Sequence, residues 1–134
     1  MAQFHLRIVT PDGLRFDGMA ESILVRTESG DVQIMRGHAE FFAPLGIGLA
    51  KLIADGKERI ASASGGFISV EKGEVNLVAT TFEFSDEIDL KRAEAAKENA
   101  EKVIHDSASD ERTVRIARAK LARAINRINT AKYK

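Results

Sequence analysis

The feature that most constrains this chain is a change of pattern near residue 85. Residues 4–79 alternate between apolar and polar side chains in short runs, and turn signals interrupt them every eight to twelve residues. Residues 88–131 consist almost entirely of helix-forming residues. A period of two indicates strands and a period of 3.6 indicates helices. The sequence therefore predicts a strand domain over residues 1–84 and a helical domain over residues 85–134, which is an α+β fold.

The first domain is predicted to be an antiparallel β-sandwich. No helix of ten residues fits between its strands, which argues against a parallel α/β sheet. The dipeptide Asp55-Gly56 is typical of a two-residue hairpin turn. Strands are expected at residues 4–8, 14–16, 22–27, 32–35, 41–45, 46–53, 58–63, 67–70 and 75–79. Many short strands with regular turn signals are typical of a sandwich or a flattened barrel.

The second domain is predicted to be an antiparallel two-helix hairpin. Its first helix should begin near Ile88, behind a cap at Ser85 or Asp86. The polar residues 106–110 are short enough to connect two helices. Apolar residues spaced three and four apart form one stripe on each helix. The stripes are Ala93, Ala96, Ala100 and Val103, and Val114, Ala117, Leu121, Ala124, Ile128 and Ala131.

The two stripes match in a single antiparallel register. It places Ala93 opposite Ala124 and Ala100 opposite Ala117. Alanine lets helices approach closely but buries little apolar area, and burial stabilises by only ~25 cal/mol per Å². We therefore expect a marginal hairpin that a better partner can open.

Composition excludes several kinds of protein. The chain has no cysteine, which excludes disulfides and thiolate chemistry and suits a reducing compartment. No apolar run approaches the roughly twenty residues that span a bilayer, and no signal core is present. We therefore expect an intracellular protein that reaches a membrane only through a partner. The three histidines are isolated, and no metal site, required cofactor or catalytic residue is expected, so the protein is predicted not to be an enzyme.

The net charge of zero hides a separation of charge along the chain. Acids dominate residues 83–111, whereas residues 112–134 carry lysines and arginines and no acid. The basic second helix should attract the acidic first helix, or another anion if the two separate.

The helix register also predicts a candidate binding pocket. It places Arg92 between Arg123 and Arg127, close to Asp89 and the free N–H groups at the start of the first helix. Three guanidiniums and a helix N-terminus suit phosphate, and a carboxylate suits a base or a ribose.

A simpler interpretation of the same residues is open. Asp89 can serve only as a helix-end acid, and the arginines can be solvated or paired with Glu87 and Glu94. The geometry of the sequence alone favours this simpler interpretation.

The chain resembles, along essentially its whole length, the epsilon subunit of bacterial and chloroplast rotary ATP synthases. Four segments carry the resemblance. They are residues 9–13, 29–38, 65–67 and the run Ile88-Asp89-Leu90-Lys91-Arg92-Ala93. The loop with Gly37-His38 and the Ile-Asp-x-x-Arg-Ala run are the most specific of these. The resemblance implies a β-sandwich followed by a helical hairpin, which agrees with the patterns above.

The resemblance implies a non-catalytic subunit of the rotor, at the cytoplasmic face of the cell membrane and peripheral to it. The sandwich would bind the gamma subunit and stand on the ring of c subunits. The ring-facing loop maps onto residues 29–42, with Ser29, Asp31 and His38 as contacts. Many relatives have Glu-Leu-Gly-Ile at residues 31–34, and proline in place of Arg36.

The resemblance also implies a hairpin that switches. Folded on the sandwich, it would permit turnover. Extended along gamma, its basic second helix would reach acidic segments of the catalytic alpha/beta head and inhibit ATP hydrolysis. The residues implied in that attraction are Arg112, Arg115, Arg118 and Arg123.

In some bacterial relatives the Ile-Asp-x-x-Arg-Ala run binds ATP and holds the hairpin down. This implies a regulatory ATP site made of Glu83, Asp89, Arg92, Ala93, Arg123 and Arg127. ATP-binding relatives tend to have arginine where this chain has Asn99. The lost cation would weaken phosphate binding by ~1.5–3 kcal/mol.

Two other functions fit parts of the sequence. The chain could be a free-standing ATP-sensing protein that uses its hairpin as a clamp. The basic helix could instead bind nucleic acid. However, Tyr133 is the only aromatic residue near it, and its alanine stripe favours a helical partner.

Overall fold

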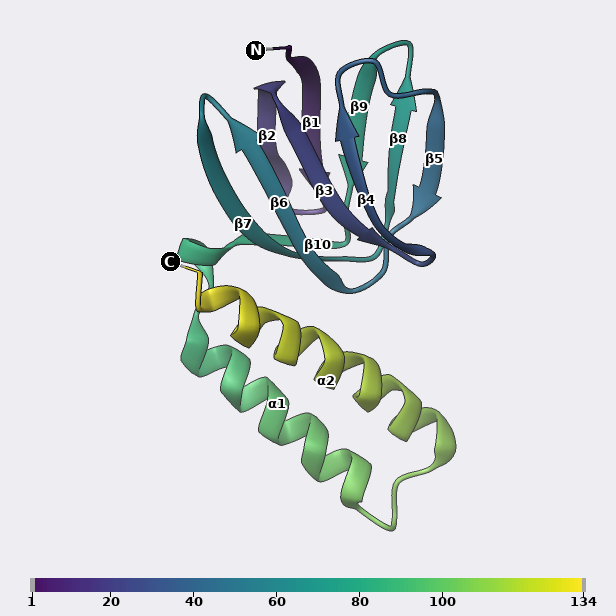
Figure 1. Ribbon diagram of the computed structural model, residues 1–134. Coiled ribbons are helices and arrows are strands. Elements are labelled where there is room, and N and C mark those ends of the chain that lie inside the picture. Colours follow the sequence, from purple (N-terminus) through teal and green to yellow (C-terminus); the bar gives the residue numbers. More distant parts are fainter. Residues whose placement is uncertain (1, 134) are drawn as a thin grey trace.

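The structure is a computed structural model that describes residues 2–133. Two five-stranded sheets pack face to face, and a helical hairpin follows them (Figure 1). The strands are β1 (Phe4–Thr10), β2 (Gly13–Ala20), β3 (Ser22–Thr27), β4 (Gly30–Met35), β5 (Phe41–Pro44), β6 (Gly48–Ala54), β7 (Lys57–Ser64), β8 (Phe67–Glu71), β9 (Glu74–Val78) and β10 (Thr81–Phe84). The helices are α1 (Leu90–His105) and α2 (Glu111–Ala131). The predicted sandwich followed by a hairpin is confirmed.

The hydrophobic core lies between the two sheets. The first sheet has the strand order β2-β1-β9-β8-β5, and the second has β10-β7-β6-β3-β4. On β1, every second side chain points into the core: Phe4, Leu6 and Ile8. The period-two pattern of the sequence is therefore the burial pattern of the sandwich.

Three details of the sheets differ from the sequence expectation. β2 continues beyond the expected strand at residues 14–16, because Asp17 and Gly18 also pair with β1. β10 was not expected, and its Phe82 and Phe84 are buried in the core. The pairing of β1 with β9 is parallel, whereas the other ladders are antiparallel.

The side chain of His5 joins the parallel pair to the edge strand. Its Nδ1 lies 2.5 Å from Oε2 of Glu74 on β9, and its Nε2 lies 2.6 Å from Oδ1 of Asp17 on β2. Both ring nitrogens can donate at once only in the protonated imidazolium. The hydrogen bonds to Asp17 and then Glu74 accordingly raise the pKa of His5 above its ordinary 6.5.

The cap of the first helix was predicted incorrectly, and the helix begins two residues after the expected Ile88. Ser85–Glu87 form a short 3₁₀ helix instead of a cap, and α1 begins at Leu90. Asp89 is the actual cap, since its Oδ1 accepts the N–H of Arg92 at 3.1 Å.

The helix begins later than expected because contacts with the sandwich hold the residues that precede it. The carboxylate of Glu87 accepts the N–H of Phe84 at 2.9 Å and contacts Nη2 of Arg15 at 2.6 Å. Ile88 is 4% exposed and its backbone is extended, so it packs inward and lies before the helix.

The two helices pack as an antiparallel pair along their alanine stripes. The buried positions are Ala93 and Ala100 on α1, and Ala117, Ala124, Thr130 and Ala131 on α2. The five alanines belong to the predicted stripes, which confirms the inner faces there, whereas Thr130 was not in a predicted stripe and is fully buried. Asp110 caps α2, and hydrogen bonds from the side chain and backbone of Thr113 lower the pKa of its carboxyl group.

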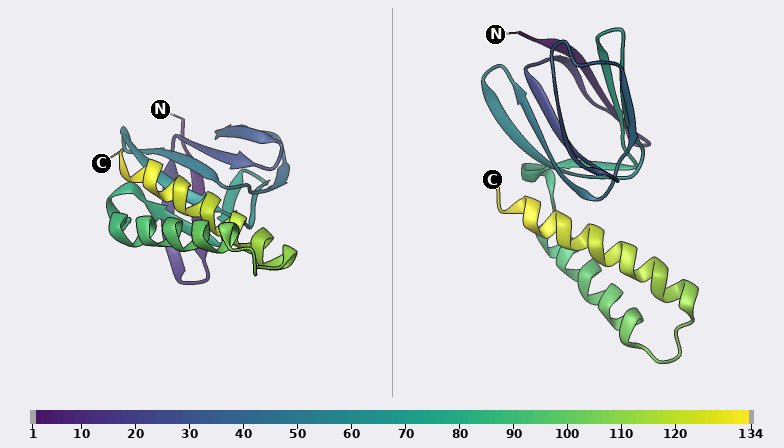
Figure 2. Two further views of the ribbon diagram at one scale, coloured as in Figure 1. Left: turned by 90° about the horizontal axis from the view of Figure 1, so that it is seen from below. Right: turned by 45° about the vertical axis from the view of Figure 1, so that its right-hand side comes forward.

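The C-terminal half of α2 holds the hairpin on the sandwich (Figure 2). It packs against β6, β7 and the 3₁₀ helix. The side-chain amide of Asn126 donates to Gly48 O and to Ser62 Oγ, both at 2.9 Å. Nε of Arg127 lies 2.9 Å from Oε1 of Glu83 on β10. These few polar contacts fix where the hairpin sits.

Asn126→Ala should loosen the docking of α2 without unfolding the sandwich. It removes two hydrogen bonds, each worth about 1 kcal/mol net. Amides in the C-terminal half of α2 should therefore exchange with solvent about tenfold or more faster. Hydrogen exchange followed by mass spectrometry measures this rate.

Asn129→Ala is the matched control, because Asn129 is an exposed asparagine on the same helix. It should leave the exchange rates unchanged. Equal protection of α2 in the two variants would show that Asn126 does not hold the hairpin.

Candidate functional site

A groove of about 470 Å³ runs between the two helices. On each helix its lining residues recur three and four positions apart, so each helix presents one face to it. The lining residues are Ala96, Asn99, Ala100 and Val103 on α1, and Thr113, Ile116, Ala117, Lys120, Arg123, Ala124 and Arg127 on α2. The small residues of the seam leave room for this groove.

The groove carries positive charge and no negative charge. Lys120, Arg123 and Arg127 line it, and none of its lining residues is acidic. Each of four other hollows in the described residues includes at least one carboxylate. The groove therefore suits an anionic ligand that also has an apolar part.

Arg127 belongs both to the groove and to the docking contact. Its Nε lies 2.9 Å from Glu83, yet this N–H makes no aligned hydrogen bond and is buried. The attraction between the two side chains is therefore mainly ionic. Arg127 links the groove to the sandwich, and Arg123, one turn earlier, is half-buried in the groove wall.

The other three predicted nucleotide residues lie at the start of α1 and do not line the groove. The carboxylate of Asp89 caps the helix. Arg92 is exposed, and Ala93 is fully buried against α2. The structure therefore brings together Glu83, Arg127 and Arg123, and leaves Asp89 in the helix-end role of the simpler interpretation. Glu87 pairs with Arg15 rather than with the predicted arginines.

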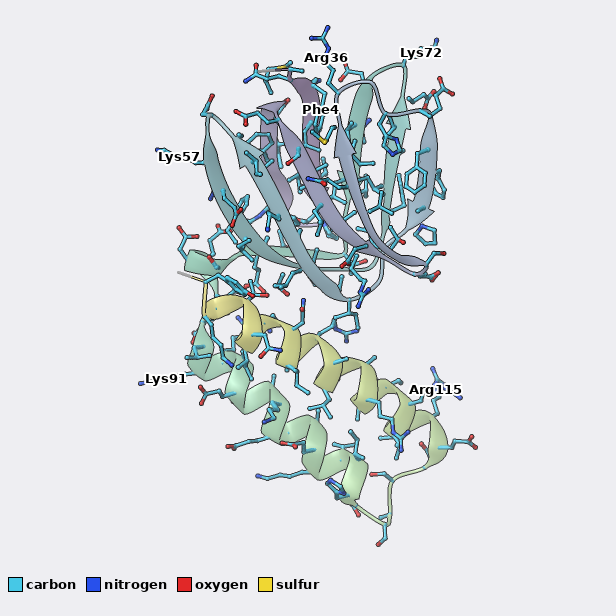
Figure 3. All side chains as sticks on the ribbon, viewed as in Figure 1. Phe4, Arg36, Lys57, Lys72, Lys91 and Arg115 are labelled. Carbon is cyan, nitrogen blue, oxygen red and sulfur yellow. The ribbon has the colours of Figure 1, made fainter. Side chains whose placement is uncertain are left out.

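The predicted partner contacts of the sandwich lie at two ends of β4. Ser29 is exposed in the turn before this strand, and Asp31 lies 3.6 Å from Nη1 of Arg26. His38 follows the other end of β4. Its ring packs edge-on against the ring of Phe41, with 5.5 Å between the ring centroids. Asp31 and His38 are separated by the strand from Asp31 to Met35, which spans about 13 Å at 3.3 Å per residue, and by a turn in which the N–H of His38 donates to Met35 O. Arg36, beside His38, lies at the end farthest from the helices (Figure 3).

The predicted contacts on α2 lie in its N-terminal half. Arg112, Arg115 and Arg118 are exposed, and no ion pair within residues 2–133 involves them. Arg115 projects near the far end of the hairpin (Figure 3). This half of α2 therefore offers unneutralised cations at a distance from the sandwich.

The sequence analysis missed two residues with roles in this region. Asn126 docks α2, and no local pattern marks an asparagine as a contact for a strand 78 residues away. Lys120 lines the groove, and its spacing of three and seven residues from Arg123 and Arg127 was readable from the sequence.

Two further searches of the described residues gave no candidate. Residues 2–133 hold no cluster of histidine and acidic side chains suited to a metal ion. Neither helix in this part of the chain is long and apolar enough to cross a membrane.

Comparisons with known proteins cover both domains. The family model of the ATP synthase delta/epsilon chain β-sandwich domain matches residues 3–85. The model of the delta/epsilon chain long α-helix domain matches residues 86–132. The boundary between these matches lies at the change of pattern in the sequence.

Individual relatives match over nearly their whole length. The ATP synthase epsilon chain of Bacillus velezensis is 41% identical over 131 residues, which cover 98% of each chain. That of Ruminococcus albus is 40% identical over 136 residues and covers all of both chains. One chain in the structure of Euglena gracilis mitochondrial ATP synthase is 23% identical, with a TM-score of 0.83 over 99% of this chain and 83% of that one. This last likeness shows the fold alone. The chain belongs to the delta/epsilon family of ATP synthase subunits, and its relatives are epsilon chains.

Proposed function

We propose that this chain is a non-catalytic subunit of the central stalk of a rotary ATP synthase and regulates ATP hydrolysis through its hairpin. The sandwich contacts the gamma subunit and the c-ring, and the protein lies peripherally at the cytoplasmic face of the membrane. It requires no cofactor. Family membership over the whole chain carries the stalk assignment.

The way α2 is docked supports a hairpin that can leave the sandwich. Its direct ties are the two hydrogen bonds of Asn126, the Glu83–Arg127 contact and packing on β6, β7 and the 3₁₀ helix, and Ser85 Oγ donates to Tyr133 O just beyond α2 at 3.4 Å. The helix–helix seam is rich in alanines, so its buried positions contribute little apolar area. Contacts of this size are compatible with a minor undocked population.

The exposed arginines of α2 supply a reason for the undocked hairpin to bind elsewhere. Arg112, Arg115 and Arg118 have no ion pair within residues 2–133. An acidic surface on the catalytic alpha/beta head would attract them and stabilise an extended, inhibitory hairpin.

Arg115→Gln combined with Arg118→Gln should raise the ATP hydrolysis rate of the assembled synthase. Each exposed ion pair contributes about 0.2–1 kcal/mol. Losing two would disfavour the inhibitory state by roughly two- to thirtyfold. The measurement is ATP hydrolysis by complexes reconstituted with wild-type or variant chain.

The control combines Lys91→Gln with Lys102→Gln, which removes two exposed cations from α1 instead. This control should hydrolyse ATP at the wild-type rate. A rate increase of the same size in the control would mean that the net charge of the hairpin governs inhibition, and not the arginines of α2 in particular.

We further propose that MgATP is the regulatory ligand of the groove. Arg123 and Arg127 would bind its phosphates. Asp89 and Arg92, which lie outside the groove lining, would reach its base and ribose from the start of α1, and the buried Ala93 would contribute only by letting the two helices approach closely. Because Arg127 also contacts Glu83, bound ATP would join both helices and the sandwich and keep the hairpin down.

Arg127→Gln should weaken the binding of MgATP to the isolated chain. A charge-assisted hydrogen bond contributes about 1.5–3 kcal/mol, so the Kd should rise by about tenfold or more. Titration calorimetry measures the Kd. Arg118→Gln, outside the groove, should bind like the wild type, and equal affinity of both variants would exclude the groove as the site.

A further inference from the structure

The groove wall contains one cation that the family resemblance does not assign. Lys120 precedes Arg123 by three residues and Arg127 by seven, so all three lie on one face of α2. All three line the groove. Along the helix axis their backbones span about 10 Å, at 1.5 Å per residue.

The three cations are not equally available to a ligand. Arg127 is already attracted to Glu83 at 2.9 Å. Neither Lys120 nor Arg123 has an ion pair within residues 2–133. Without Lys120, Arg123 would be the groove's only cation not paired with an acid.

The opposite wall offers no positive charge. Asn99 is the polar residue that α1 contributes to the groove, and its amide is neutral. Within the groove, the protein's positive charge for a ligand therefore comes from α2. A monoanion could be satisfied by Arg123, whereas a linked chain of phosphates needs cations spread along the wall.

We propose that Lys120 is the third cationic contact for the polyphosphate of a nucleotide in the groove, and that it makes the groove prefer a triphosphate to a monophosphate. This inference rests on the proposed nucleotide site. Lys120 acts as a mobile point charge at the exposed end of the cationic row, where a terminal phosphate can be reached without moving the backbone.

The test is titration calorimetry of the full chain with MgATP and, separately, with AMP. The variants are Lys120→Gln, Lys120→Arg and the control Lys102→Gln, whose side chain is exposed on α1 and does not line the groove. Lys120→Gln should raise the Kd of MgATP by about tenfold or more, as expected for a charge-assisted contact. Its Kd for AMP should change less than threefold. Lys120→Arg, which keeps the charge, and Lys102→Gln should both bind MgATP as tightly as the wild type.

The outcomes separate this inference from the proposed function. If the wild type binds MgATP and Lys120→Gln binds it equally well, Lys120 is not a contact, although the ATP site stands. If Lys120→Gln weakens MgATP and AMP equally, the preference for a triphosphate does not come from Lys120. If the wild type shows no saturable binding at millimolar MgATP, both the ATP site and the role of Lys120 are wrong. Circular dichroism checks that the variants keep their helical content.

Discussion

The small-residue seam between α1 and α2 is the constraint on which the behaviour of this protein depends. Alanines at positions such as Ala100 and Ala117 let the helices approach closely, but they bury little apolar area. Two helices of this length are marginal without tertiary support. The seam therefore makes the hairpin dependent on what it packs against, and it leaves the groove that a ligand can fill.

The sandwich and the hairpin are stabilised in different ways. The sandwich has a continuous apolar core between two sheets, so it is a rigid platform. The hairpin is attached by the amide of Asn126, by the ionic contact between Glu83 and Arg127, and by packing on β6, β7 and the 3₁₀ helix. In the proposed function, this rigid base with its docked arm acts as a two-state element, whose balance a ligand or a partner shifts. In this account ATP favours the docked state and the acidic catalytic head favours the extended one.

The sequence was sufficient for the architecture because local periodicity reflects burial directly. The alternation of Phe4, Leu6 and Ile8 and the stripe from Ala93 onward predicted the inner faces correctly. It was insufficient where a distant contact decides the local structure. The parallel pairing of β1 with β9 and the contact of Asn126 with Gly48 depend on chain topology. The helix begins at Leu90 because Asp89 caps it and the preceding segment is held by the sandwich; Asp89 was a readable cap, whereas the contact of Glu87 with Arg15 was not.

The most direct test of this account is the distance between the hairpin and the sandwich in the assembled synthase. The chain has no cysteine, so Lys57→Cys on β7 and Ser107→Cys in the turn between the helices can carry a pair of spin labels. Pulsed electron spin resonance then gives the distribution of distances with and without MgATP. The account predicts one narrow distance with MgATP and a second, longer distance when nucleotide is removed. The same single distance under both conditions would contradict a ligand-controlled hairpin.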